Sequence, residues 1–146
     1  MMAREELVLE ARDVQRKLGK LAQRLAESNE ACTAISLRDP SAEELMRLES
    51  LSARFERGID IFVRTFLRIL DTLEGTEGGT IIDVLSRAER RGFIQSADEF
   101  YDMRYNRNRI AHEYLDVEAL EMASFVREKT PALLDALRLG TQYNIR

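Results

Sequence analysis

The sequence is poor in the residues from which disulfides and metal sites are built. It contains one cysteine, Cys32, and one histidine, His112. A single cysteine cannot form a disulfide within one chain, and one cysteine with one histidine cannot assemble a zinc site of the usual kind. We therefore expect no metal and no cofactor.

Long apolar runs and chain-breaking residues are also scarce. No segment approaches the ~18 consecutive apolar residues that a membrane-spanning helix needs, and residues 1–6 lack the apolar core of a signal peptide. Only two prolines and seven glycines interrupt the 146 residues. These features favour a cytoplasmic, helix-rich protein without a membrane segment.

The residues that are present have the proportions of a globular protein. Apolar residues make up 45% of the chain and charged residues 33%, and the length suits a single domain, residues 1–146. The formal net charge is −4. This charge argues against a general nucleic-acid coat protein but allows a local basic patch.

Two long helices are expected in the first half of the chain, because apolar residues recur there at steps of three and four. The first, over residues 4–28, carries an apolar stripe at Leu7, Ala11, Val14, Leu18, Leu21 and Leu25. The second begins at the capping box of Ser41 and Glu44. Its stripe holds Leu48, Phe55, Ile59, Phe62, Phe66, Ile69 and Leu73, with added apolar residues at Ile61, Val63, Leu67 and Leu70. One bundle of this size would have difficulty covering both sets, so we predict a two-fold dimer.

Three further helices complete the expected fold. A short one covers residues 80–91, with Gly92 placed to end it, and Ser96 with Glu99 opens the next by the capping-box pattern. A last helix begins after Asp116, and residues 130–131, Thr-Pro, either kink it or divide it. The fold class is therefore all-α, an antiparallel bundle of four main helices plus a short additional helix.

Residues 105–114, Tyr-Asn-Arg-Asn-Arg-Ile-Ala-His-Glu-Tyr, combine the one histidine with groups that can bind a phosphate. On an ideal helix, steps of four, three and four form one stripe of Tyr101, Tyr105, Asn108 and His112. Arg109 lies one position off this stripe, whereas Arg107 falls roughly 140° from His112. Arg107 and His112 converge only if the helix end distorts, the arginine wraps around, or a second subunit supplies the facing residue. Spacing alone is compatible with a packing role or a catalytic role for His112.

A family resemblance favours the catalytic role. Residues 107–114 resemble the R-N-x-x-x-H-x-Y signature of the HEPN superfamily, in the branch encoded beside minimal nucleotidyltransferases. Upstream, residues 82–89 (IDVLSRAE) and 92–94 (GFI) resemble the helix and turn that precede the signature in that branch. The resemblance covers roughly residues 80–137. One departure is that Phe100 or Tyr101 stands where many relatives carry tryptophan, which affects packing and no chemical role.

The resemblance implies a homodimer in which the signature helices of both subunits face one cleft. It implies a metal-independent endoribonuclease toxin, held in check by a nucleotidyltransferase antitoxin, with Arg107 and His112 as its catalytic residues. The signature tyrosine, Tyr114, can also accept a nucleotide from that partner, as in AMPylation. Asn108 is placed to orient the imidazole or to donate to the phosphate.

The residue chemistry is compatible with this activity. Histidine titrates near neutral pH and can act as base or acid, and arginine offers a planar fork of donors to phosphate oxygens. One histidine cannot be base and acid at once. A two-histidine mechanism therefore needs the second subunit.

A rival interpretation is a non-catalytic subunit that binds a nucleotide or substrate for a minimal nucleotidyltransferase. The acidic net charge favours this interpretation, since an RNA cleft usually needs positive potential. Against it, six arginines surround the central stretch in the sequence: Arg87, Arg90, Arg91, Arg104, Arg107 and Arg109. We accordingly expect Arg104 and Arg109, together with Asn108, to bind the RNA.

Overall fold

The computed structural model describes residues 3–76, 78–110 and 116–146, with side chains described throughout except at 107–110 and 116–119. Its elements are α1 (Arg4–Cys32), α2 (Ala42–Asp60), the π-helix η1 (Ile61–Phe66), α3 (Leu67–Leu73), α4 (Ile81–Arg90), α5 (Ala97–Ile110) and α6 (Asp116–Gln142). No strand occurs among these described residues. The all-α prediction is confirmed.

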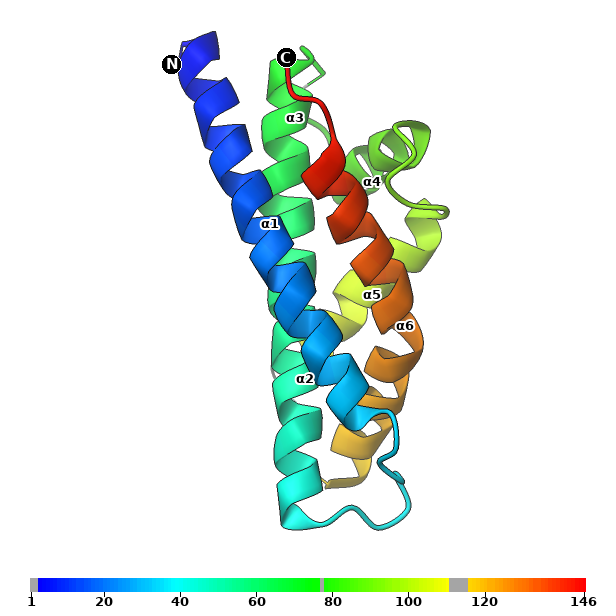
Figure 1. Cartoon of the computed structure of the whole chain (residues 1–146). Coiled ribbons are helices and arrows are strands. Elements are labelled where there is room, and N and C mark those ends of the chain that lie inside the picture. Colours follow the sequence, from blue (N-terminus) through cyan, green and yellow to red (C-terminus); the bar gives the residue numbers. More distant parts are fainter. Residues whose placement is uncertain (1–2, 77, 111–115) are drawn as a thin grey trace.

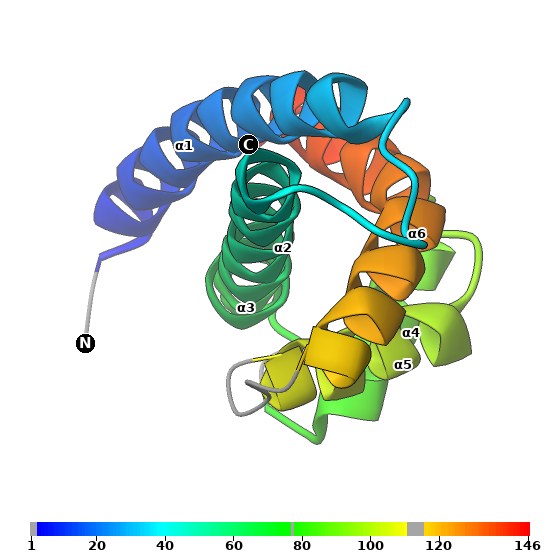
Figure 2. The ribbon, with the colours of Figure 1, turned by 90° about the horizontal axis from the view of Figure 1, so that it is seen from below.

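The segments α2, η1 and α3 form one continuous rod at the centre of the molecule (Figures 1 and 2). Helix α1 runs against the rod in the opposite direction, and α6 runs alongside both (Figure 1). The short α4 and the oblique α5 close the remaining side of the rod (Figure 2). The core therefore lies around the rod, and its apolar residues meet neighbours on several sides.

Local signals set the helix ends. The Ser41 hydroxyl accepts from the Glu44 amide at 3.1 Å, and the Glu44 carboxylate accepts from the Ser41 amide at 3.0 Å, as the capping box predicts. Gly92 ends α4 with a φ of 86°. Its amide donates to Glu89 and the Phe93 amide donates to Ala88, which satisfies carbonyls at the helix end.

One helix end differs from the expected one, and the alternatives at residues 130–131 are decided in favour of an undivided helix. Helix α1 continues to Cys32, because Ser28 and Cys32 extend its buried stripe. Helix α6 runs unbroken through Pro131, and Figure 2 shows it curving around the rod. Pro131 has no N–H, and the Thr130 hydroxyl donates to the Val126 carbonyl at 2.7 Å. The hydroxyl thus gives the helix a polar contact in the turn that proline disturbs.

The rod buries adjacent residues in pairs, four positions apart: Gly58–Ile59, Phe62–Val63, Phe66–Leu67 and Leu70–Asp71. In a regular α-helix a step of four residues overshoots a full turn by about 40°, so such pairs would drift off one face. In η1 the hydrogen bonds span five residues, as from the Leu67 amide to the Phe62 carbonyl. This wider turn offsets the drift and keeps the pairs directed at the core.

Because the paired residues of the rod all face the core, their packing no longer argues for a dimer. The side chains of Phe62, Val63, Phe66, Leu67 and Leu70 are at most 1% exposed within a single chain. Of the remaining members of the two sets, Ile61 and Ile69 are partly buried against the same core. The expectation that one chain has difficulty covering both apolar sets was wrong. A dimer must be argued from the chemistry instead.

Candidate functional site

Helix α5 carries the beginning of the signature and is fixed to the core along one side. Ala97, Phe100 and Met103 are buried there, and the Phe100 ring lies 6.1 Å from the Phe62 ring of the rod. At the N-terminus of α5 the Ser96 hydroxyl accepts from the Glu99 amide at 3.1 Å. The helix is therefore held in place at its start and along its inner face.

Charged side chains add two further attachments for α5. The Glu89 carboxylate of α4 accepts from the Ala97 amide at 3.0 Å. The Glu99 carboxylate forms an ion pair of 3.3 Å with Lys129 of α6. These contacts fix α5 between α4 and α6.

The outer side of α5 presents two tyrosines. Tyr101 is 42% exposed and Tyr105 is 58% exposed, one helical turn apart. They are the described part of the stripe on which the sequence places Asn108 and His112. The sequence analysis included both tyrosines in this stripe but assigned them no role. An aromatic pair among polar neighbours, on the helix that leads into the signature, is the sequence signal that could have indicated one.

The predicted site residues themselves are described only in part. The backbone is helical through Arg107, Asn108 and Arg109 up to Ile110, but their side chains lie outside the described residues. His112 and Tyr114 also lie outside the described residues. The predicted pairing of Arg107 with His112 therefore stays a prediction.

Arg104 is the one predicted site residue whose side chain is described. It is half-buried and interacts with another group of the chain. An arginine in such a position must exchange or share its present partner if it is to bind a phosphate.

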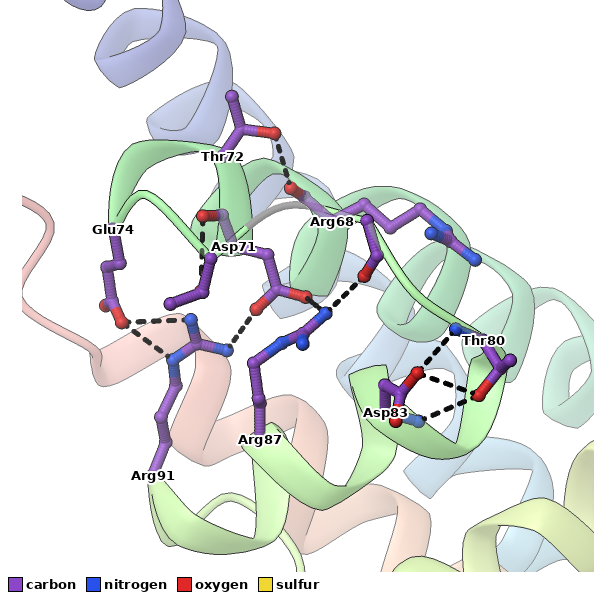
Figure 3. A network of polar contacts seen from close by, with 10 residues as sticks. Arg68, Asp71, Thr72, Glu74, Thr80, Asp83, Arg87 and Arg91 are labelled. Carbon is purple, nitrogen blue, oxygen red and sulfur yellow. Dashed lines mark hydrogen bonds and ion pairs between the residues drawn. The ribbon is translucent and has the colours of Figure 1, made fainter.

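Two of the arginines expected around the signature, Arg87 in α4 and Arg91 directly after it, are held by carboxylates at the end of the rod. The Asp71 carboxylate, 2% exposed, pairs with Arg87 at 3.0 Å and with Arg91 at 2.8 Å (Figure 3). Arg87 also donates to the Gly78 carbonyl at 2.7 Å, and Arg91 pairs with Glu74 at 2.9 Å. Their charges are neutralised where α3 meets α4. The expected contribution of Arg87 and Arg91 to positive potential around the signature was wrong.

The strength of this polar network differs from contact to contact. The Arg91 Nη1 and Asp71 Oδ1 atoms are close, but they are not aligned for a hydrogen bond, so their contact is an ion pair. Burial lowers the pKa of Arg91, but the close contact with Asp71, together with the hydrogen bonds to Glu74 and its attraction, outweighs burial and raises the pKa above its ordinary value. Arg91 therefore stays charged and holds both carboxylates.

The network continues through Tyr143 to the C-terminal segment. Burial raises the pKa of Glu74, yet hydrogen bonds from Tyr143 and Arg91 outweigh it and leave that pKa below its ordinary value. The same hydrogen bond to Glu74, followed by burial, raises the pKa of Tyr143. These groups keep fixed protonation states near neutral pH, which suits structural polar contacts rather than acid–base catalysis.

Two grooves lined by described residues lie away from α5. A shallow groove of about 460 Å³ runs between α1 and α6, beside Gly19 and Arg138. A second, of about 420 Å³, adjoins the C-terminal segment beside Arg4 and Tyr143. Neither groove is lined by a residue of α5, so neither belongs to the predicted site.

Two searches of the described residues gave further findings. They contain no group of three or more histidine, cysteine, aspartate or glutamate side chains that could hold a metal ion. None of their helices has both the length and the apolar character needed to span a membrane.

Comparisons with protein-family models, curated proteins and solved structures found no match to this chain. The HEPN resemblance therefore depends on the signature, the upstream turn and the helical pattern of the sequence itself.

Proposed function

We propose that this protein is a metal-independent endoribonuclease, the toxin of a HEPN and nucleotidyltransferase toxin–antitoxin pair. The observation that carries the proposal is the setting of the signature. It begins in a helix that is fixed to the core on one side and presents exposed tyrosines on the stripe leading to His112. Because a rigid helix positions side chains more accurately than a loop, this is a suitable base for a phosphate-binding arginine and a histidine.

In the proposed reaction, one histidine removes the proton from a ribose 2′-OH. The 2′-oxygen then attacks the adjacent phosphorus while Arg107 stabilises the charge on the phosphorane oxygens. A second proton donor protonates the leaving 5′-oxygen as the P–O bond breaks. The products are a 2′,3′-cyclic phosphate and a free 5′-hydroxyl.

The chain has a single histidine, so the second donor in this proposal is His112 of another copy in a dimer cleft. Light scattering at micromolar concentration tests the assembly. A subunit-mixing experiment tests the cleft: His112→Ala chains are mixed with wild-type chains, and because a mixed dimer holds a single His112, activity should fall more steeply than the fraction of wild-type chains. A strictly monomeric protein that still cleaves RNA would exclude the two-histidine mechanism.

The direct test of activity is incubation of the purified protein with total RNA in EDTA. We expect cleavage that leaves 2′,3′-cyclic phosphate ends and disappears in His112→Ala. Arg16→Ala is the matched control, because Arg16 is an exposed arginine on α1 and far from the signature in the sequence. Cleavage that persists in His112→Ala would point to a contaminating nuclease.

A non-catalytic binding subunit of a minimal nucleotidyltransferase is the second candidate. The observation that favours it is the neutralisation of Arg87 and Arg91 by Asp71 and Glu74 in a chain of net charge −4. This leaves less positive potential for an RNA backbone than the sequence suggests. Binding of RNA or nucleotide without cleavage would support this candidate over the first.

Control by the partner is proposed to act through Tyr114. A transferred nucleotide would place a phosphate beside the arginines intended for RNA, and would inhibit by charge and bulk together. A phenol is a poor nucleophile at neutral pH, so the partner must activate it. Co-expression with the neighbouring nucleotidyltransferase should add mass in nucleotide units, and Tyr114→Phe should remove that addition. Inhibition without added mass would leave complex formation as the mechanism.

A further inference from the structure

Aromatic side chains are distributed unequally over the molecule. Five of the six phenylalanines are buried, and Phe125 and Tyr143 are partly buried against the same core. Among the aromatic side chains that the structure describes, Tyr101 and Tyr105 alone are exposed, and both lie on the outer side of α5. The folded chain thus places its two open aromatic faces on the helix that leads into the signature.

The geometry of the pair suits flat ligands. Residues four apart on a helix have Cβ atoms about 5–6 Å from one another, so both tyrosines lie on one ridge of the helix. Nucleobases stack on such rings whatever their sequence, because every base has a π-face. RNA-binding proteins commonly read unpaired bases in this way.

The charges around the pair indicate which part of the RNA would touch it. Asp98 and Asp102 are exposed on α5 beside Tyr101. These carboxylates repel phosphates, so a strand lying here presents its bases to the helix and its backbone to solvent or to the signature. The contact would depend on stacking and little on salt.

We propose that Tyr101 and Tyr105 form a stacking platform for unpaired bases of single-stranded RNA, next to the signature. The inference rests on the proposed function in that it assumes an RNA ligand, but it does not require cleavage. It assigns the two tyrosines to substrate binding and the signature to chemistry. The expected substrates are therefore RNAs with short unpaired segments, because a base in a duplex cannot reach the tyrosine rings.

Binding of a fluorescein-labelled oligoadenylate is measured in a His112→Ala background, which prevents turnover. Tyr101→Ala and Tyr105→Ala should each raise the Kd about 5- to 150-fold, the usual effect of removing one stacking ring. Tyr101→Phe and Tyr105→Phe keep the ring and should bind as the parent does. The ratio of Kd between Tyr105→Ala and the parent should be the same in low and high salt.

A fluorescence measurement tests stacking directly. The chain has no tryptophan, so Tyr105→Trp creates a single reporter, and Leu9→Trp on α1, at a site 64% exposed, is the matched control. We expect RNA to quench Tyr105→Trp and to leave Leu9→Trp unchanged. Quenching without any cleavage by the wild-type protein would retain the platform and reject the ribonuclease.

Other outcomes would overturn the platform. Cleavage by the wild-type protein, together with unchanged binding by both alanine variants, would reject the platform and retain the ribonuclease. Emission from Tyr105→Trp that shifts with protein concentration alone, with Tyr105→Ala monomeric where the parent is dimeric, would make the pair a contact between copies. Absence of RNA binding in every variant would reject the platform and the RNA-directed function together.

Discussion

The chain has two arginine-rich stretches, one over residues 87–91 at the end of α4 and one over residues 104–109 in the second half of α5. Arg87 and Arg91 of the first are 17% and 10% exposed and held by Asp71, which is 2% exposed. Helix α5 instead presents exposed tyrosines. The first stretch joins α3 to α4, whereas the second begins the signature.

The difference teaches that an arginine's role depends on what is buried opposite it. Asp71 lies 16 residues before Arg87 in the sequence, on another helix. Leaving a buried carboxylate unpaired is costly, so the arginines that reach it become part of the structure. Variants of the α5 stretch should therefore lose activity, whereas variants that disturb the α4 stretch should lose stability.

The largest effect is expected for activity at the α5 stretch. Arg107→Ala should lower the rate of RNA cleavage by about 10²- to 10³-fold, because it removes a donor to the transition-state oxygens. Its melting temperature by circular dichroism should match that of the wild-type protein. A large fall in melting temperature together with the loss of activity would make Arg107 a structural residue like Arg91, and the comparison would fail.

The next effect is expected for stability at the α4 stretch. Asp71→Ala removes the buried carboxylate that Arg87 and Arg91 share, leaving Arg91 with Glu74 and Arg87 with the Gly78 carbonyl, and should lower the free energy of unfolding by about 3–5 kcal/mol. Urea unfolding measures this change. Asp13→Ala is the control, because Asp13 lies on the surface of α1 with Arg16 and Lys17 and should show no measurable change. Wild-type stability in Asp71→Ala would show that the network is dispensable.

A smaller effect should come from packing outside both stretches. A Cβ at Gly140 would lie 3.1 Å from both Leu18 and Phe66, so Gly140→Ala should cost about 1–3 kcal/mol. A Cβ at Gly19 meets Thr141 at an ordinary 3.6 Å, and Gly19→Ala should gain roughly 0.5–1 kcal/mol from helix propensity. Thermal melts should therefore shift in opposite directions. Shifts of the same sign would show that the α1–α6 contact relaxes around added atoms.

The smallest effect concerns pH. The lowered pKa of Glu74 means that its contribution to stability is present above the unfolded pKa, about 4.3, and is lost as the pH falls through the folded pKa. The raised pKa of Tyr143 means that its contribution is present below its unfolded pKa, about 10, and is lost as the pH rises through the folded pKa.

Tyr143→Phe should therefore be less stable than the wild-type protein near neutral pH and equal to it in strong acid and strong alkali. The difference should stay below about 1 kcal/mol, because the Glu74 side chain is 40% exposed and solvent screens it. Urea unfolding across the pH range measures it. Phenylalanine keeps the ring contact with Phe93, so a difference that does not change with pH would show that the Tyr143 hydroxyl acts through something other than its hydrogen bond to Glu74.

The helices and several of their ends could be predicted from the sequence because their signals are local. The Ser41–Glu44 box and the Gly92 stop each involve residues within a few positions. The Thr80–Asp83 box at the start of α4 was missed, although aspartate at that position can replace the usual glutamate. Helix ends were thus predicted where the capping residues were of the most common types.

Long-range contacts could not be predicted in the same way. The pairing of Asp71 with Arg87 and Arg91 depends on how α3 meets α4, and the sequence offers only a lone charge among apolar residues as a hint. The expectation that one chain could not cover all the apolar residues of the rod was wrong, because it assumed a regular helix where η1 widens the turn. For the site, the helix that carries the start of the signature, residues 107–110, was predictable, whereas the exposure of Tyr101 and Tyr105 required the packed helix.

The π-turn in the rod has a consequence for how the chain tolerates changes of length. The i→i−5 bonds of η1 take up one more residue than a regular α-helix would over the same length. Deleting one residue within Ile61–Phe66 would therefore allow an uninterrupted α-helix and would leave α2 and α3 close to their present relative orientation. A deletion near the end of α2 has no extra residue to remove, so it would rotate the earlier part of α2 by about 100° and turn Leu48, Leu51 and Phe55 away from the core. The middle of the rod is therefore the place where the loss of one residue should be tolerated best.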